Sequence, residues 1–172
     1  MPAADALVIR DVTPGDAAAL AGYIAALAAE AVDTLALMNP LPQPDDERRW
    51  VETTLTVPHA FILGAFDGPH VAGLIDFRPT TAPKRTVSGS FGMSVARPWR
   101  GQGLGRRLLQ AMIERARIER PGLMRIELEV VPWNVGAIAL YESMGFRHEG
   151  RRQRAIQFRG KPEAMLLMAR TC

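Results

Sequence analysis

Residues 95–106 read VARPWRGQGLGR, and the last seven of them hold three glycines and two arginines. A segment with strand character precedes this run, and a long amphipathic pattern follows it. Glycines allow the backbone to approach a ligand without a Cβ in the way. The helix that follows supplies about four free N–H groups and a partial positive charge at its start. Arg100 and Arg106 add fixed positive charge. The run therefore predicts a loop that binds a phosphate or pyrophosphate group.

Two familiar phosphate-binding loops do not match this run. A P-loop requires Gly-Lys-Ser/Thr after four intervening residues, whereas Gly105 is followed by Arg106 and Arg107. A dinucleotide-binding fingerprint has its third glycine where Arg106 stands, and it occurs early in a βαβ unit. The remaining alternative is that the glycines only tighten a turn from strand to helix, which the density of glycine and arginine disfavours.

Hydrophobic periodicity and turn residues predict the elements on either side of the loop. Strands are expected at residues 6–10, 60–66, 70–77, 86–95 and 125–131, then from Phe146 and at 164–169. Helices are expected at about 14–30, from 45 or 46 onward, at 103–118 and at 135–144. Thr13 is a candidate cap for the first helix. The third helix has a buried stripe made of Leu104, Leu108, Leu109, Met112 and Ile113. The chain shows no internal repeat and no long linker, so residues 1–172 are predicted to form one α/β domain.

Composition narrows the function classes. The chain has 172 residues, 48% of them hydrophobic and 23% charged, with a net charge of +3, which is typical of a globular protein. Its basic residues are dispersed, so nucleic acid is not an expected partner. His59, His70, His148 and the single cysteine, Cys172, follow no ligand spacing, so no metal is expected. The sequence has no signal peptide pattern and no run of ~18 apolar residues. A cytoplasmic protein without a membrane partner is the expectation.

A family resemblance adds to this interpretation. The run 95–105 resembles the acetyl-CoA motif Arg/Gln-x-x-Gly-x-Gly/Ala of the GNAT superfamily of N-acetyltransferases. A second block is similar to the family's Asn…Ala…Tyr…Gly-Phe stretch and consists of Asn134, Ala137, Leu140, Tyr141 and Gly145-Phe146. The resemblance covers the whole chain in element order and is specific over 88–148. It departs from the family at Arg97, where proline is common, with Pro98 shifted by one position before the loop.

The resemblance implies a fold and an activity. The fold is a mixed, mostly antiparallel sheet of about seven strands flanked by about four helices. Within it, the strand ending at Val95 splays from a parallel neighbour that begins near Arg125. The activity is transfer of an acetyl group from acetyl-CoA, without a metal, to a primary amine of a small molecule, a polyamine or a peptide N-terminus. The amine would attack directly in a ternary complex.

The resemblance also implies which residues bind the cofactor. The pantetheine arm would pair with backbone groups of Met93 and Val95, and a backbone N–H near them would polarise the thioester oxygen. The pyrophosphate would lie on the loop and helix start, formed by Arg100, Gly101, Gln102, Gly103, Leu104, Gly105 and Arg106. Asn134 would hydrogen-bond the cofactor arm, cap the helix that follows it, or do both.

Candidate catalytic residues follow from the chemistry of acetyl transfer. Tyr141 is the candidate general acid, since a phenol with a pKa near ~10 can protonate a thiolate; the alternative is a tyrosine packed against the sheet. The general base is left open. Glu127 and Glu129 share one face of their strand by alternation, and Asp76 on an earlier strand is a further candidate.

The acceptor pocket is implied to lie between residues 30–46 and the turn at 157–163. Carboxylates in the first segment that could attract a cationic amine are Glu30, Asp33, Asp45 and Asp46, whose ordinary function is to end or cap helices. A non-catalytic acyl-CoA-binding module on the same fold is the main rival, and a nucleic-acid-binding protein is a weaker one. The sequence leaves open whether the protein forms a homodimer.

Overall fold

The computed structural model describes residues 6–30, 40–81 and 87–172. Within those residues it contains seven strands and four helices, in the order predicted. They are β1 (Val8–Asp11), α1 (Ala17–Ala29), α2 (Pro44–Thr56), β2 (Phe61–Asp67), β3 (His70–Pro79), β4 (Ser88–Val95), α3 (Leu104–Glu119), β5 (Arg125–Val130), α4 (Val135–Ser143), β6 (Arg147–Phe158) and β7 (Lys161–Thr171). Short 3-10 turns occupy Pro14–Asp16 and Arg97–Trp99.

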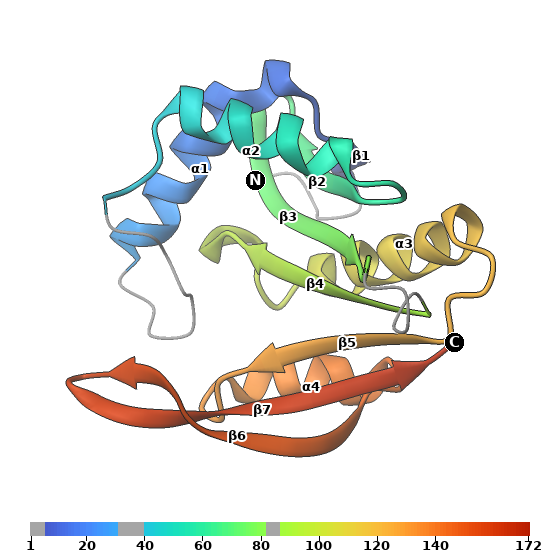
Figure 1. The fold of residues 1–172 in the computed structure, drawn as a ribbon. Helices are drawn as coiled ribbons and strands as arrows, with labels where there is room; N and C mark the ends of the chain where they lie inside the picture. The colour runs from blue at the N-terminus through green and yellow to red at the C-terminus, as the bar shows by residue number, and fades with distance from the viewer. Residues whose placement is uncertain (1–5, 31–39, 82–86) are drawn as a thin grey trace.

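The described strands form one sheet in the order β1-β2-β3-β4-β5-β7-β6 (Figure 1). Five of its neighbouring pairs are antiparallel, and β4 and β5 are parallel. The predicted mixed, mostly antiparallel sheet with one parallel pair is therefore confirmed. A parallel pair requires a crossover connection, which α3 provides between β4 and β5.

The parallel pair separates soon after it begins. Only Ser88, Gly89 and Ser90 of β4 have partners on β5, and these are Arg125, Ile126 and Glu127. Beyond Ser90 the two strands diverge, as Figure 1 shows toward its left side. The predicted splay is confirmed, and it leaves the last five residues of β4 without a neighbour on this side.

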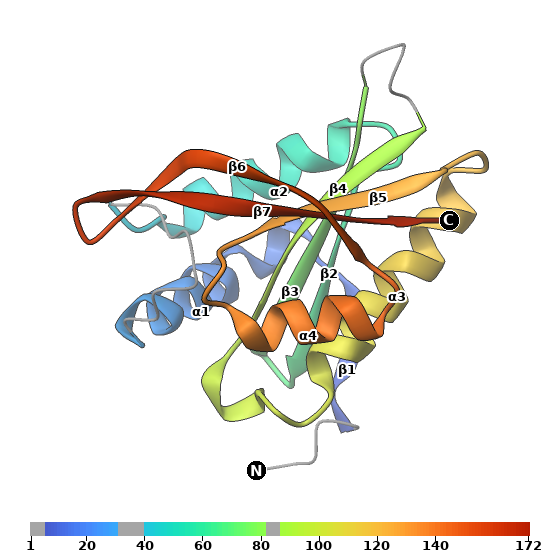
Figure 2. The same ribbon diagram turned by 90° about the horizontal axis from the view of Figure 1, so that it is seen from below.

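Alternation along the strands divides the core into two clusters. Ile62 of β2 packs with Leu20 and Leu27 of α1 and with Val51 of α2. Phe61 and its same-face neighbours pack instead against Leu108, Met112 and other residues of α3. Figures 1 and 2 show α1 and α2 on one side of the sheet and α3 on the other. The predicted stripe of α3 is confirmed, since all five of its residues are buried.

Helix α1 begins later than predicted. Residues 14–16 form a 3-10 turn, and the carboxylate of Asp16 accepts hydrogen bonds from the backbone N–H and the hydroxyl of Thr13, at 2.8 and 2.9 Å. Thr13 occupies the N-cap position of this turn and forms a capping box with Asp16, so it caps the 3-10 turn that leads into α1. The expected helix start at about residue 14 is three positions too early, because Pro14 and Gly15 favour a tight turn.

The last two strands are longer than predicted. β6 has twelve residues and β7 has eleven, whereas the pattern predicted a strand from Phe146 and another at 164–169. Nearly every residue of β6 is exposed, so the strand lacks the apolar alternation that marks a half-buried strand. Its register with β7 shifts between Arg152 and Ile156, where Arg154 has a φ of 50°. This bulge changes the direction of the residues that follow.

Candidate functional site

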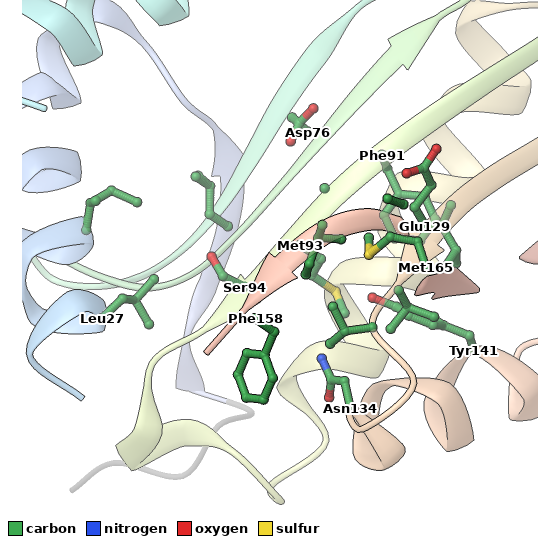
Figure 3. Close-up of a pocket in the computed structure, with 18 of the residues that line it drawn as sticks. Leu27, Asp76, Phe91, Met93, Ser94, Glu129, Asn134, Tyr141, Phe158 and Met165 are labelled. Atoms are coloured by element: carbon green, nitrogen blue, oxygen red, sulfur yellow. The ribbon is translucent and has the colours of Figure 1, made fainter. Parts of the chain in front are cut away.

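The divergence of β4 from β5 opens a cavity of about 860 Å³, called here the large cavity. Its walls include residues 91–94 of β4, 128–130 of β5 and Val131, which follows β5 (Figure 3). Ile24 and Leu27 of α1 and residues 155–158 of β6 also line it. The bulge in β6 therefore brings the end of that strand to the cavity, and the predicted turn at 157–163 contributes Gln157 and Phe158.

A second cavity of about 670 Å³, the loop cavity, lies at the glycine loop. Gly101 and Gly103 have φ values of 72° and 82°, a left-handed conformation that side chains disfavour. A Cβ at either position would meet no atom within 4 Å, so the backbone faces open space. The first backbone bond of α3 runs from Arg107 N to Gly103 O. The N–H groups of residues 104–106 therefore precede the helical ladder and are free for a ligand.

Gly105 and Leu104 serve packing. A Cβ at Gly105 would lie 3.2 Å from Leu140 Cδ2 and within 4 Å of the side chains of Met93 and Val95. The missing side chain lets the start of α3 approach both α4 and β4. Leu104 is fully buried in the core, so only its backbone N–H can contribute to the predicted anion site.

The polar side chains of the loop hold it in place. Arg100 Nε donates to Val95 O at 2.8 Å, and its Nη2 lies 2.6 Å from Glu30 Oε2. Arg106 Nη2 donates to Ser143 Oγ at 2.7 Å. Gln102 donates to Pro98 O at 2.7 Å and does not line either cavity. The two arginines do line the loop cavity, so their charge lies beside the predicted anion site even though each guanidinium has a protein partner.

Asn134 caps α4. Its Oδ1 accepts a hydrogen bond from Ala137 N at 3.3 Å, which confirms the capping alternative. The same residue lines both cavities, and Figure 3 shows its amide nitrogen directed toward the large cavity. The cap uses only the carbonyl oxygen, so the NH₂ group is available to a cofactor.

Tyr141 lies where the two cavities meet. It lines both, and its side chain packs against Phe91 and Phe146, with ring centroids 5.8 and 5.9 Å away. Burial raises the pKa of Tyr141 to about 12. Figure 3 shows the hydroxyl directed into the large cavity. The phenol is both packed and accessible, and it stays protonated at neutral pH.

Of the three candidate general bases, the structure places two at the large cavity and one outside it. Glu129 lines the large cavity, and its Oε1 lies 2.6 Å from Arg152 Nη1. Glu127 lies two residues earlier, 3.3 Å from Arg125 Nε, and does not line the cavity. Asp76 lines it from β3. Burial raises the pKa of Asp76, and Arg78, 2.7 Å away, opposes that shift.

The acidic residues expected near the acceptor have other partners. Glu30 pairs with Arg100, and Asp46 pairs with Arg49 at 2.8 Å in the first turn of α2. Asp45 lies in the same turn. None of these three lines either cavity. Asp33 lies outside the described residues.

Two contacts at the site carry no sequence signal. Tyr23 Oη and Ser94 Oγ are 2.9 Å apart, and Ser94 lines both cavities. Trp133 and Phe158 stack with centroids 4.4 Å apart, and they line the loop cavity and the large cavity respectively. All four residues are ordinary core or turn residues by pattern, so only the fold brings them to the site.

Residues 6–30, 40–81 and 87–172 contain no group of three or more His, Cys, Asp or Glu side chains that could hold a metal ion. Among the helices of this described part of the chain, none is long and apolar enough to cross a membrane.

Comparison with known proteins identifies the family. The model of the acetyltransferase (GNAT) family matches residues 25–146, and the chain belongs to this family. An L-methionine sulfoximine/L-methionine sulfone acetyltransferase from Pseudomonas aeruginosa is 31% identical over 146 residues, which cover 83% of this chain and 81% of that protein. The [ribosomal protein bS18]-alanine N-acetyltransferase of Escherichia coli is 45% identical over 56 residues, 33% of this chain. The match spans only 36% of that relative's length.

Solved structures agree with this assignment. A GNAT-family acetyltransferase from Streptococcus pneumoniae superposes with a TM-score of 0.86 at 25% identity, covering 96% of this chain and 98% of that one. The structure of yncA from Salmonella typhimurium with its cofactor acetyl-CoA gives a TM-score of 0.81 at 21% identity, covering 96% and 94% of the two chains. The second likeness concerns the fold alone.

Proposed function

We propose that this protein transfers the acetyl group of acetyl-CoA to a primary amine by direct attack in a ternary complex. One observation carries the proposal: Met93, Ser94, Asn134 and Tyr141 line both cavities. A group held in the loop cavity and an acceptor in the large cavity would therefore meet beside Tyr141. Of the two relatives named above, one is an L-methionine sulfoximine/L-methionine sulfone acetyltransferase and the other an alanine N-acetyltransferase, which favours a primary amine as acceptor.

The residues of the loop cavity fit acetyl-CoA. Open space faces Gly101 and Gly103, and the start of α3 offers free N–H groups to a diphosphate. The last residues of β4 have lost their partner on β5, so the backbone groups of Met93 and the N–H of Val95 are available to an extended amide-containing arm, while Val95 O already accepts a hydrogen bond from Arg100. When bound there, acetyl-CoA supplies an activated acetyl group as a thioester.

Proton transfer is assigned to two side chains. Glu129 accepts a proton from the acceptor's ammonium, directly or through a water, because it is the candidate on β5 that faces the cavity. The amine then forms a bond to the acetyl carbon as the carbon–sulfur bond breaks. Tyr141 donates its proton to the leaving thiolate, and the second proton that the nitrogen loses on becoming an amide returns to the phenolate of Tyr141, directly or through water. A backbone N–H near Met93 to Val95 would stabilise the negative charge that develops on the acetyl oxygen.

Binding of coenzyme A measured by calorimetry tests the cofactor half of the proposal. Gly103→Glu should weaken binding by about 100-fold or more, because a carboxylate would meet the diphosphate. Gly122→Glu is the matched control, since Gly122 also has a positive φ of 97° and open space around it but lies outside both cavities. Equal binding by the two variants would refute the assigned loop.

Release of the free thiol of coenzyme A tests whether the protein transfers the acetyl group to an amine. The wild-type protein with acetyl-CoA is assayed over amino acids, amino-acid analogues such as methionine sulfone, polyamines and peptides with free N-termini. At least one amine should release free coenzyme A and appear as its acetamide by mass spectrometry. Tight coenzyme A binding without turnover on any amine would favour a non-catalytic acyl-CoA-binding module.

A further inference from the structure

Helix α1 forms one wall of the large cavity through Ile24 and Leu27. Two polar contacts fasten the C-terminal half of this helix to the chain that leads into the glycine loop. One is the Tyr23–Ser94 hydrogen bond of 2.9 Å. The other is made by Glu30, which follows the last residue of the helix.

Glu30 uses both carboxylate oxygens at this junction. Its Oε1 accepts a hydrogen bond from Arg97 N at 2.9 Å, and its Oε2 lies 2.6 Å from Arg100 Nη2. Arg100 in turn donates from Nε to Val95 O at 2.8 Å. One carboxylate therefore joins the end of α1 to Arg97 and Arg100, and Arg100 links it in turn to Val95, the last residue of β4.

The position is unfavourable for helix stability alone. A carboxylate at the C-terminal end of a helix faces the negative end of the helix dipole, and the Glu30 side chain is only 13% exposed, so part of its hydration is lost as well. The Arg97 N–H and the charge of Arg100 offset both effects in part, since Oε2 is buried and forms an ion pair but no hydrogen bond. Asp16, before the N-terminal end of the same helix, is the favourable counterpart: it is 14% exposed and pairs with Arg10 at 2.7 Å.

We propose that Glu30 is a positioning residue that couples the cofactor loop to the acceptor wall. The inference rests on the proposed function, because it takes the glycine loop as the diphosphate site and the large cavity as the acceptor site. A diphosphate that fixes the loop also fixes Arg100, and Arg100 holds Glu30. The end of α1 becomes ordered, and with it the wall formed by Ile24 and Leu27. Acetyl-CoA thereby raises the affinity for the amine without contacting it.

Hydrogen exchange with coenzyme A as the probe tests the coupling. In the wild-type protein, saturating coenzyme A should slow exchange of the α1 amides over residues 24–30 by about fivefold or more, at the lower end of typical coupling factors. In Glu30→Gln, which keeps an acceptor for Arg97 N but loses the ion pair, this protection should fall below about twofold. Protection at residues 101–106 and the calorimetric Kd for coenzyme A should stay within about threefold of wild type.

Asp16→Asn is the matched control. Like Glu30→Gln, it removes one ion pair from a carboxylate of similar burial next to α1. It should retain the wild-type protection of residues 24–30. Once an amine is identified, Glu30→Gln should raise the KM for that amine with kcat nearly unchanged. The coupling is refuted if wild-type α1 gains no protection, if Glu30→Gln gains as much as wild type, or if Asp16→Asn loses protection equally. Failure of coenzyme A to bind the wild-type protein would instead remove the proposed function.

Discussion

The ring of Tyr141 packs edge to face on the ring of Phe91, with centroids 5.8 Å apart and ring planes at 78°. Phe91 is the first residue of β4 beyond its pairing with β5. The contact therefore fixes the phenol at the point where the two strands separate. Its position depends on apolar packing, which a phenylalanine could reproduce.

Tyr141→Phe separates packing from proton donation. The variant keeps the ring contacts with Phe91 and Phe146, so its melting temperature and its affinity for coenzyme A should stay close to wild type. Its kcat should fall by about 100-fold or more, the usual contribution of a general acid. Steady-state kinetics on the best amine measures this, and a kcat within threefold of wild type would remove Tyr141 from the chemistry.

Glu129→Gln and Glu127→Gln form a matched pair, because both residues lie on the same face of β5 and only Glu129 lines the large cavity. Glu129→Gln should lower kcat/KM by about 10- to 100-fold at pH 7, toward the lower end of general-base effects. The defect should shrink as the pH approaches ~10, where an alkylamine loses its proton unaided. Glu127→Gln should remain within about threefold of wild type, since it contacts no proposed substrate. Equal pH–rate profiles for the two variants would contradict the assignment.

The Arg10–Asp16 pair predicts that the free energy of unfolding decreases at low pH. The hydrogen bond from Arg10 lowers the pKa of Asp16 to about 2 from its ordinary value of 3.8. A lowered pKa means that the folded state binds the proton less readily than the unfolded state. The contribution to stability is therefore complete above pH ~4 and is lost as the pH falls through ~2. Asp16→Asn should lower the free energy of unfolding by about 1 to 2 kcal/mol at pH 7, after allowance for solvent around Arg10.

Urea unfolding at several pH values measures this difference. The wild-type and Asp16→Asn curves should differ by a constant amount between pH 5 and 7 and converge near pH 2. A difference that persists unchanged at pH 2 would show that Asp16 acts through packing or the Thr13 cap rather than through its charge.

Most of the fold could be predicted from local pattern. The apolar stripe of α3 and the alternation of β2 and β3 report burial directly, and Gly101 and Gly103 occur where the backbone requires a positive φ. β6 could not be predicted in length, because an exposed edge strand carries no hydrophobic period. The start of α1 differs from the prediction by three residues, because the sequence does not show that Pro14–Asp16 forms a 3-10 turn before the α-helix begins.

The parts of the candidate site that are formed by the backbone could be predicted from the sequence. The parts that are formed by side chains from distant elements could be predicted less well. The loop follows from glycine spacing, and the splay follows from the family resemblance. Alternation could not separate Glu127 from Glu129, because the difference arises only where β5 leaves β4. Arg100 and Glu30 are 70 residues apart in sequence, so no local pattern could reveal their contact.

The hairpin of β6 and β7 is a part of the molecule where substitutions should cost little stability. β6 pairs only with β7 among the described strands, and most of its side chains touch solvent. Substitutions at residues 155–157 therefore alter one cavity wall while disturbing only the pairing with β7, whereas Phe158 also contacts Trp133. The end of β4, by contrast, contacts α1 through Ser94 and the start of α3 through Met93 and Val95. On the proposed function, evolution or design could exchange one amine for another at this edge and keep the donor chemistry intact.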